Sequence, residues 1–219
     1  MNQRQFRTGL IAVLYLLIGN ALGAQSASKN DILLAAASPF EDLTEYALAA
    51  NTNGMKLALK AYADQAAGVG EVLAAQARKD MDALIAIIKK AERQGDNETV
   101  ALKSVEVYRI LIGSLDVSGL AVPIQVSLLD YAGFKFKALL HAKSIDWLAL
   151  KKVAEEAQQN WAAIQSRVAD KGLHDAVDTT IAGIYKACTE KNAEMAAFAA
   201  QIDLALVDLL EGYFERSSK

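Results

Sequence analysis

The chain is poor in the residues that build covalent or metal-held scaffolds. Its 219 residues include one cysteine, two histidines and two prolines, and aromatic residues make up only 7%. A single cysteine excludes an internal disulfide, so a hydrophobic core has to hold the fold together. The absence of a Cys-x-x-Cys-His motif excludes covalent haem attachment of that kind. No histidine follows a glutamate by three residues, which counts strongly against a ferritin-like di-iron site.

Positive charge is also scarce. The formal net charge is −3 at pH 7, and no cluster of lysine and arginine stands out along the chain. A protein with this balance has no electrostatic footprint for nucleic acid or for an anionic membrane surface. We therefore expect neither nucleic acid nor a stable membrane association among the partners of the mature chain.

Residues 1–23 have the pattern of a secretory signal peptide. Arg4 and Arg7 precede a short apolar run, and Ala21-Leu22-Gly23 places small residues where signal peptidase reads the chain. Cleavage before Ala24 would change the net charge from −3 to −5, because the segment holds two arginines and no acid. The apolar run is short for a membrane span, although an uncleaved anchor is the alternative. We expect an exported protein, periplasmic or secreted.

Residues that favour helices are abundant. Hydrophobic residues make up 53% of the chain, with alanine and leucine dominant, and low proline favours helices over sheets. After a flexible leader at 24–37, Ser38-Pro39-Phe40-Glu41 has the pattern of a helix start. Asn51-Thr52-Asn53-Gly54 is a weak spot for a helix. Punctuation by glycine, proline and capping residues predicts helices at 39–66, 71–93, 97–113, 123–142, 146–170, 173–190 and 193–214.

The spacing also suggests an internal duplication. Pro39 and Pro123 each open a predicted helix, and Glu45-Tyr46-Ala47 aligns with Asp130-Tyr131-Ala132. Two halves, 39–113 and 123–190, would each hold three helices, with a C-terminal helix at 193–214. Similarity by chance between alanine-rich helices is the alternative. Because short connections force neighbouring helices antiparallel, we expect an all-α, up-and-down bundle of six or seven helices within one domain, 38–216.

Five side chains are the candidates for ligand binding. Tyr46 and Tyr131 each follow an acid at matching places in the two halves, while Trp147 and Trp161 are the only indoles of the chain. They would line a groove between the halves, or they simply pack in the core with tyrosine hydroxyls at its wet boundary. His141 is the fifth candidate. A half-buried histidine on an apolar helix face is one interpretation, and a ligand to a metal or haem iron is the other.

The acidic residues and the single cysteine are weaker candidates for a functional site than these five side chains. Glu41 and its neighbours suit the first turn of a helix, and Asp208, Glu211 and Glu215 share one stripe of the last helix. A loose cation site with oxygen ligands, built from such acids, stays open. Cys188 lies among apolar residues at helical spacing, as a buried inert thiol would.

No catalytic constellation, nucleotide loop or strong metal motif is present in the sequence. We therefore expect an exported, non-enzymatic helical bundle that binds a partner protein or a small apolar ligand in the cell envelope. The alternative is a metal- or haem-binding bundle that uses His141. The sequence itself names no cofactor and no catalytic residue.

Overall fold

The computed structural model describes residues 27–217, and the expected signal peptide lies outside this range. The described residues contain no strand, which confirms the predicted all-α class. Their helices are α1 (Lys29–Leu48), α2 (Thr52–Ala63), α3 (Ala66–Val72), α4 (Ala75–Gln94), α5 (Asn97–Ile112), α6 (Ile124–Leu140), α7 (Trp147–Ile164), the 3-10 turn η1 (Gln165–Arg167), α8 (Lys171–Glu190) and α9 (Ala193–Ser217). None of these helices is long and apolar enough to cross a membrane.

The first helix begins ten residues before Pro39, so the prediction that Pro39 opens a helix is wrong, and most of the expected leader is helical. Ser28 caps α1, because its hydroxyl accepts from the Asp31 backbone N–H while the Asp31 carboxylate accepts from the Ser28 backbone N–H. Pro39 is buried inside the helix. Proline costs an interior hydrogen bond, but Leu33 and Phe40 on either side of it are buried in the core. Packing therefore outweighs the local signal.

The weak spot expected around residues 51–54 is a break between two helices. Ala50 has a positive φ of 52°, and the Asn51 side chain caps α2 by accepting from the Gly54 backbone N–H at 3.0 Å. A Cβ on Gly54 would lie 2.5 Å from the Tyr46 ring, so only glycine lets the end of α1 pack here. Gly68 and Gly70 fall between the predicted helices 39–66 and 71–93, but both residues are helical and belong to α3.

Other helix ends lie close to where the sequence places them. Gly95 has the left-handed conformation that ends α4, and Asp96 caps α5. Pro123 immediately precedes α6, and Asp146 caps α7. Helix α7 is shorter than predicted, since it ends at Ile164 and gives way to η1. Helix α8 starts at Lys171 after an Asp170 cap, so Gly172 lies in its first turn and does not precede it.

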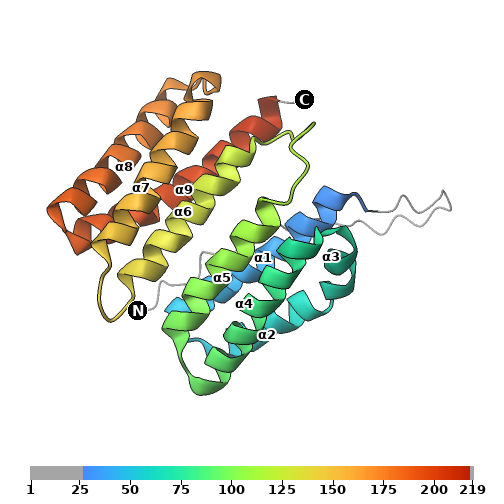
Figure 1. Ribbon diagram of the computed structural model, residues 1–219. Helices are drawn as coiled ribbons and strands as arrows, with labels where there is room; N and C mark the ends of the chain where they lie inside the picture. Colours follow the sequence, from blue (N-terminus) through green and yellow to red (C-terminus); the bar gives the residue numbers. More distant parts are fainter. Residues whose placement is uncertain (1–26, 218–219) are drawn as a thin grey trace, which may run out of the picture.

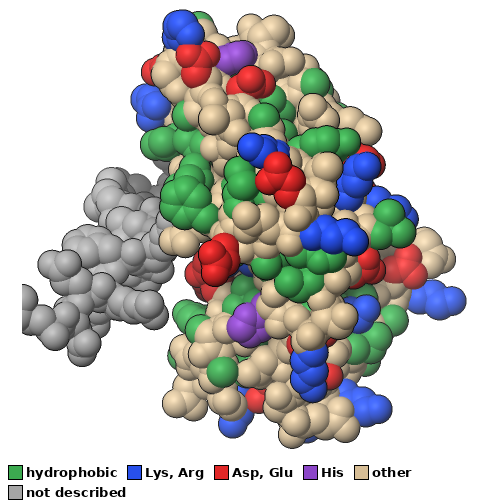
Figure 2. Space-filling model, turned by 90° about the vertical axis from the view of Figure 1, so that its left-hand side faces the viewer, with side chains coloured by type: hydrophobic (Ala, Val, Ile, Leu, Met, Phe, Trp, Pro, Cys, Tyr) green, Lys and Arg blue, Asp and Glu red, His purple; other side chains and the backbone are tan. Residues whose placement is uncertain are grey.

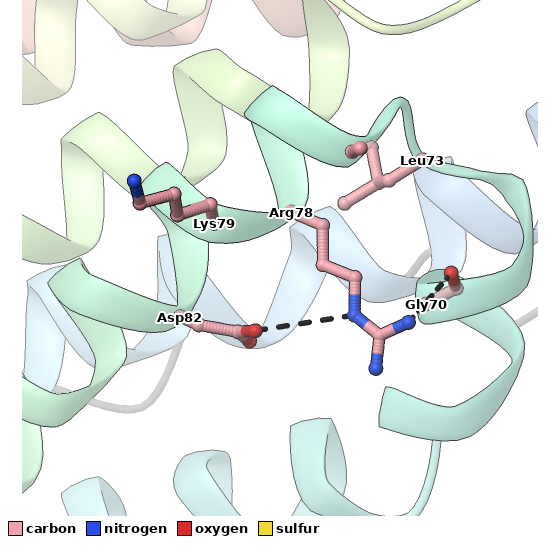
Figure 3. A pocket seen from close by; sticks show the side chains of 6 residues that line it. Gly70, Leu73, Arg78, Lys79 and Asp82 are labelled. Atoms are coloured by element: carbon pink, nitrogen blue, oxygen red, sulfur yellow. Dashed lines mark hydrogen bonds and ion pairs between the residues drawn. The ribbon is translucent and has the colours of Figure 1, made fainter.

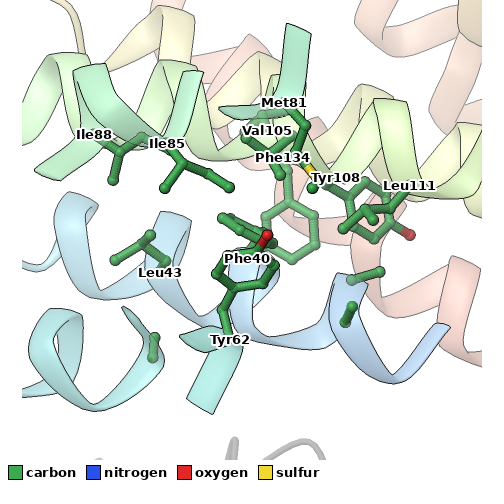
Figure 4. Close-up of a cluster of buried hydrophobic side chains, with 14 of the residues drawn as sticks. Phe40, Leu43, Tyr62, Met81, Ile85, Ile88, Val105, Tyr108, Leu111 and Phe134 are labelled. Carbon is green, nitrogen blue, oxygen red and sulfur yellow. The ribbon is translucent and has the colours of Figure 1, made fainter. Parts of the chain in front are cut away.

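The helices pack in two groups around two hydrophobic clusters. Helices α1–α5 surround the first cluster, whose centre holds Phe40, Tyr62 and Met81 (Figure 4). Helices α6–α9 surround the second, which includes Phe136 and Trp161. Figure 1 shows the two groups side by side, and α6 contacts both α5 and α1 across the junction.

Helix α6 belongs to both clusters. Its Tyr131 and Phe134 side chains join the first cluster, whereas Leu129 and Phe136 join the second. It also approaches α9 closely at Gly133, where an added Cβ would lie 2.6 Å from Leu204 Cδ2. Helix α6 is therefore the shared element on which both halves of the molecule are assembled.

A network of paired polar groups joins α5 to α6 and α7, and we call it the paired network. Lys135 forms an ion pair with Glu106, and Arg109 donates to the Tyr131 hydroxyl at 3.0 Å and to the Glu156 carboxylate at 3.1 Å. The guanidinium of Arg109 also lies 4.7 Å from the centre of the Tyr131 ring. Each cation in this network has an anionic partner.

Candidate functional site

The five predicted ligand-binding side chains do not come together. Tyr46 is half-buried against the start of α2, and Tyr131 is buried in the paired network. Trp161 is buried, with its ring 5.3 Å from His174 and its N–H directed to Asp178. Trp147 packs at the edge of the second cluster. The two tyrosines have unrelated surroundings, so the proposed duplication loses its anchor.

His141 alone borders an open groove. Helix α6 ends at Leu140, so His141 is its C-cap and is exposed, contrary to the expectation of a half-buried side chain on a helix face. The groove has a volume of about 290 Å³ and lies where α1, α6 and α9 meet. Its lining is Leu48, Lys137, Leu140, His141, Ala197 and Gln201. Three apolar side chains thus stand beside three polar ones, a mixture suited to a small amphipathic molecule.

Acidic side chains gather along the same junction, towards the N-terminal end of α6. We call Glu41, Asp130, Asp203 and Glu211 the acid cluster; they come from α1, α6 and α9. Asp130 accepts a hydrogen bond of 2.9 Å from the Tyr108 hydroxyl of α5. One turn further along α6, the space where a Gly133 Cβ would stand is 3.1 Å from Asp203 Oδ2. The next turn carries Lys137.

Asp203 is the deepest member of the acid cluster. Only 2% of its surface is exposed, and its Oδ2 atom has no hydrogen-bond partner among the described residues. A buried polar atom without a partner is costly and uncommon in folded proteins. Burial raises the pKa of Asp203 from 3.8 to about 7. Its carboxyl group therefore holds a proton over much of the range below neutrality.

The other members are half-buried, and their charges act on one another. Burial, followed by the charges of Asp208 and Glu215, raises the pKa of Glu211 to about 7. Burial and then the charge of Asp130 hold the pKa of Glu41 well above 4.5. The pKa of Asp130 is also raised, by burial first, although the hydrogen bond from Tyr108 lowers it. Like charges in a poorly solvated place disfavour full ionisation.

No cation of the described residues compensates these charges. None of the ion pairs in residues 27–217 includes Glu41, Asp130, Asp203 or Glu211. On the side of α6 that carries Asp130, the next lysine is Lys137, seven residues further on, and its Nζ atom lies 3.3 Å from Glu45. Within residues 27–217, the junction of α1, α6 and α9 thus gathers four acids that no lysine or arginine pairs, next to an open groove.

A second open pocket lies in the first half, between α3 and α4. Its lining includes Gly70, Arg78 and Asp82 (Figure 3). Arg78 Nη1 donates to the Gly70 carbonyl oxygen at 3.3 Å, and Arg78 Nε lies 3.9 Å from the exposed Asp82 carboxylate. Because Arg78 pairs with Asp82 and no buried polar atom of its lining lacks a partner, this pocket is weaker as a candidate than the junction.

The remaining candidates for metal or nucleophilic chemistry lie apart. The two histidines are well separated on the face drawn in Figure 2, and no group of three or more His, Cys, Asp or Glu side chains within residues 27–217 is arranged to hold a metal ion. Cys188 is a free, buried thiol as expected, and burial raises its pKa to about 11. A thiol with that pKa is not a nucleophile at neutral pH.

Each acid of the cluster, taken alone, has an ordinary sequence pattern. Glu41 resembles an ordinary first-turn acid, and Asp203 stands alone between apolar residues of the last helix. An acid on the apolar face of a helix was the signal that could have found the site, since burial of a carboxyl group needs a reason. No protein-family model, no curated protein and no solved structure matches this chain.

Proposed function

We propose that this chain is an exported, non-enzymatic helical-bundle protein of the cell envelope that binds a small ligand or a partner protein. The observation that carries the proposal is the junction of α1, α6 and α9, where an open groove adjoins the acid cluster. A concave, partly apolar site with a few polar groups is the usual form of a ligand site. The site also joins both halves of the molecule, so a bound ligand would contact each of them.

A groove-filling variant tests this proposal. Ala197 is exposed on the groove wall, so Ala197→Trp should block the groove without disturbing the core. The probe is 1-N-phenylnaphthylamine, an apolar dye whose fluorescence increases on binding. We expect saturable binding to the unmodified chain and binding at least about tenfold weaker, or about 1.4 kcal/mol, in the variant. The matched control is Ala86→Trp, at an exposed alanine of α4. Equal binding by both variants would contradict the proposal.

Export is tested separately. Residues 1–23 support it through their arginine-flanked apolar run and small residues. Expression of the full chain in a Gram-negative host should place the protein in the periplasm, with Ala24 as its first residue by intact mass. A protein that retains Met1 and stays in the cytoplasm would refute this part of the proposal, while leaving the dye experiment unaffected.

A haem- or metal-binding protein is the second candidate function. Its support is the exposed imidazole of His141, which makes no side-chain hydrogen bond or ion pair within residues 27–217 and is thus open to a ligand role. Titration with hemin distinguishes the two functions. A Soret band that His141→Ala removes, and that the control His174→Ala preserves, would favour haem binding over the first proposal.

We also propose that the helices form an up-and-down bundle. Consecutive helices contact each other from α4 to α9, as this arrangement requires. A duplicated three-helix unit is not part of the proposal, because Pro39 lies within α1 whereas Pro123 precedes α6. A measured structure in which helices 124–140 and 193–217 run parallel would exclude the bundle as proposed.

A further inference from the structure

We propose that the acid cluster is a binding site for an organic cation that carries an ammonium group. This inference rests on the proposed function and deepens it, because it gives the chemical class of the ligand at the junction of α1, α6 and α9. The same group occurs in free polyamines and in lysine side chains of a partner protein. Both sources share the chemistry that the cluster would recognise, and the experiment below separates them.

The buried carboxyl of Asp203 is the first support. An acid cluster alone is often only a solvated surface, but Asp203 is almost completely buried and its Oδ2 atom has no partner in residues 27–217. It lies beside Gly133, one helical turn from Asp130, and its charge acts on Asp130. A donor placed between these two carboxyl groups would satisfy an atom that the protein leaves unsatisfied.

The half-exposed rim is the second support. Glu41, Asp130 and Glu211 are neither fully buried nor fully exposed, so a ligand can reach them from solvent while Asp203 lies beneath. Tyr108 donates to one oxygen of Asp130, which fixes that carboxyl group and leaves its other oxygen for a ligand. The half-exposed acids therefore come from three helices, α1, α6 and α9.

The arrangement suits an ammonium group better than a metal ion. A metal ion requires several ligand atoms that converge on one point at about 2.0–2.6 Å, and no group of three such side chains within the described residues meets that need. An ammonium group has three donors that point in different directions, so in the proposed complex each would bond a carboxyl group of a different helix. Charge-assisted hydrogen bonds of this kind are among the stronger ones in proteins.

The neighbouring groove gives the ligand a second contact. Lys137 at the groove is seven residues from Asp130, or about 10 Å along α6. Leu48 and Leu140 of the groove are apolar and accept a hydrocarbon segment. A ligand with an amine at one end and methylene groups beyond it would therefore contact both parts of the junction.

Proton release should accompany binding. The acid cluster holds protons near neutral pH because burial and mutual repulsion raise the pKa values of its members. A cation favours their ionised forms and so displaces protons. The titratable groups that face the site from the surrounding helices are Glu41, Asp42 and Glu45 of α1, Tyr108 of α5, Asp130 and Lys137 of α6, and Asp203, Asp208, Glu211 and Glu215 of α9.

Calorimetry with spermidine tests the proposal. The full chain is titrated at pH 7.5 in two buffers with different ionisation enthalpies, at constant ionic strength. We expect saturable binding, an enthalpy that depends on the buffer, and affinity about tenfold lower in Asp130→Asn and in Glu211→Gln. Neutral amides relieve repulsion, so both variants should fold, which circular dichroism verifies. The controls are Asp64→Asn and Glu71→Gln, at exposed acids in the first half.

Further arms identify the source of the cation. Binding of a lysine-rich peptide that these variants weaken, together with no binding of spermidine, would assign the site to a partner protein. Equal effects of Mg²⁺ and spermidine, or equal binding by all variants and controls, would overturn the proposal. The two proposals fail separately. Ala197→Trp should weaken dye binding at least about tenfold and spermidine binding by a smaller factor, because the contacts of the ammonium group with the acid cluster are kept. Glu211→Gln should weaken spermidine binding about tenfold and leave dye binding unchanged.

Discussion

The two polar networks on α6 differ in how their charges are compensated. In the paired network, Lys135 and Arg109 each contact a carboxylate of a neighbouring helix. In the acid cluster, which starts at Asp130, the residue just before Tyr131, no lysine or arginine of residues 27–217 pairs with its four members. Adjacent residues of one helix therefore enter opposite electrostatic environments. We infer that the paired network stabilises the packing of α5 against α6. The acid cluster instead destabilises the folded chain, because its acids are left available for a ligand.

The largest expected effect is a fall in stability as the pH rises from 5 to 8. A carboxyl group whose pKa is higher in the folded than in the unfolded chain favours folding at low pH, and this advantage is lost as the pH rises through the folded pKa. The pKa of Asp203 is about 7 in the folded chain against an ordinary 3.8, so its ionisation between pH 5 and pH 8 would cost about 3 kcal/mol at most. Urea unfolding at both pH values measures the change. Greater stability at pH 8 would contradict it.

Removal of the buried charge should reverse much of this loss. Asp203→Asn keeps the shape of the side chain but cannot ionise, so we expect it to raise the free energy of unfolding at pH 8 by about 1–3 kcal/mol. At pH 5 the variant and the parent chain should be nearly equal. The matched control is Asp64→Asn, at an exposed acid. A variant that is less stable at pH 8 would show that the Asp203 carboxylate has a partner.

In the paired network, removal of a charged side chain should lower the free energy of unfolding, whereas in the acid cluster it should raise it. Lys135→Met leaves the half-buried Glu106 carboxylate without its ion pair, so we expect a loss of about 1–2 kcal/mol at pH 8. The control is Lys151→Met, which removes a more exposed pair with Glu155 on α7 and should cost less than about 0.5 kcal/mol. Urea unfolding of both variants tests the comparison. An equal decrease in the free energy of unfolding would mean that the Lys135–Glu106 pair does not stabilise the packing of α5 against α6.

The smallest expected effect concerns the geometry of Arg109. Arg109→Lys keeps the positive charge but loses the planar group that stacks on Tyr131 and bonds Glu156 at the same time. We expect a loss of about 0.5 kcal/mol, because the pair is nearly half exposed. Thermal unfolding in low and high salt provides the measurement. A loss as large as that of Lys135→Met would show that stacking contributes more than charge.

Local chemistry explains which parts of the fold were predictable. Gly95, Asp96 and Pro123 act through their own backbone conformation and hydrogen bonds, so their positions in the sequence predict helix ends. Pro39 shows the limit of this approach. Its local pattern predicts a helix start, but burial of Leu33 and Phe40 extends the helix through it, and that burial depends on helices far along the chain.

The candidate site was less predictable for the same reason. His141 stands out in the sequence because histidine is rare there, and it borders the groove. Glu41, Asp130 and Asp203 are separated by more than seventy residues in each case, and no periodicity connects them. Only the packing of α1, α6 and α9 brings them together. Acids within apolar helix faces, such as Asp203, are the feature that sequence reasoning can use in similar bundles.

The single thiol, Cys188, is a native probe of how often the second half of the molecule opens. Cys188 is buried among the side chains of α6–α9, and its raised pKa keeps it unreactive while they stay packed. A colorimetric thiol reagent can therefore react only during excursions that expose this cluster, and its rate reports their frequency. No engineered label is needed, because the chain has no other cysteine. The rate of thiol modification therefore shows whether a ligand at the junction lowers the frequency with which helices α6–α9 open and expose Cys188.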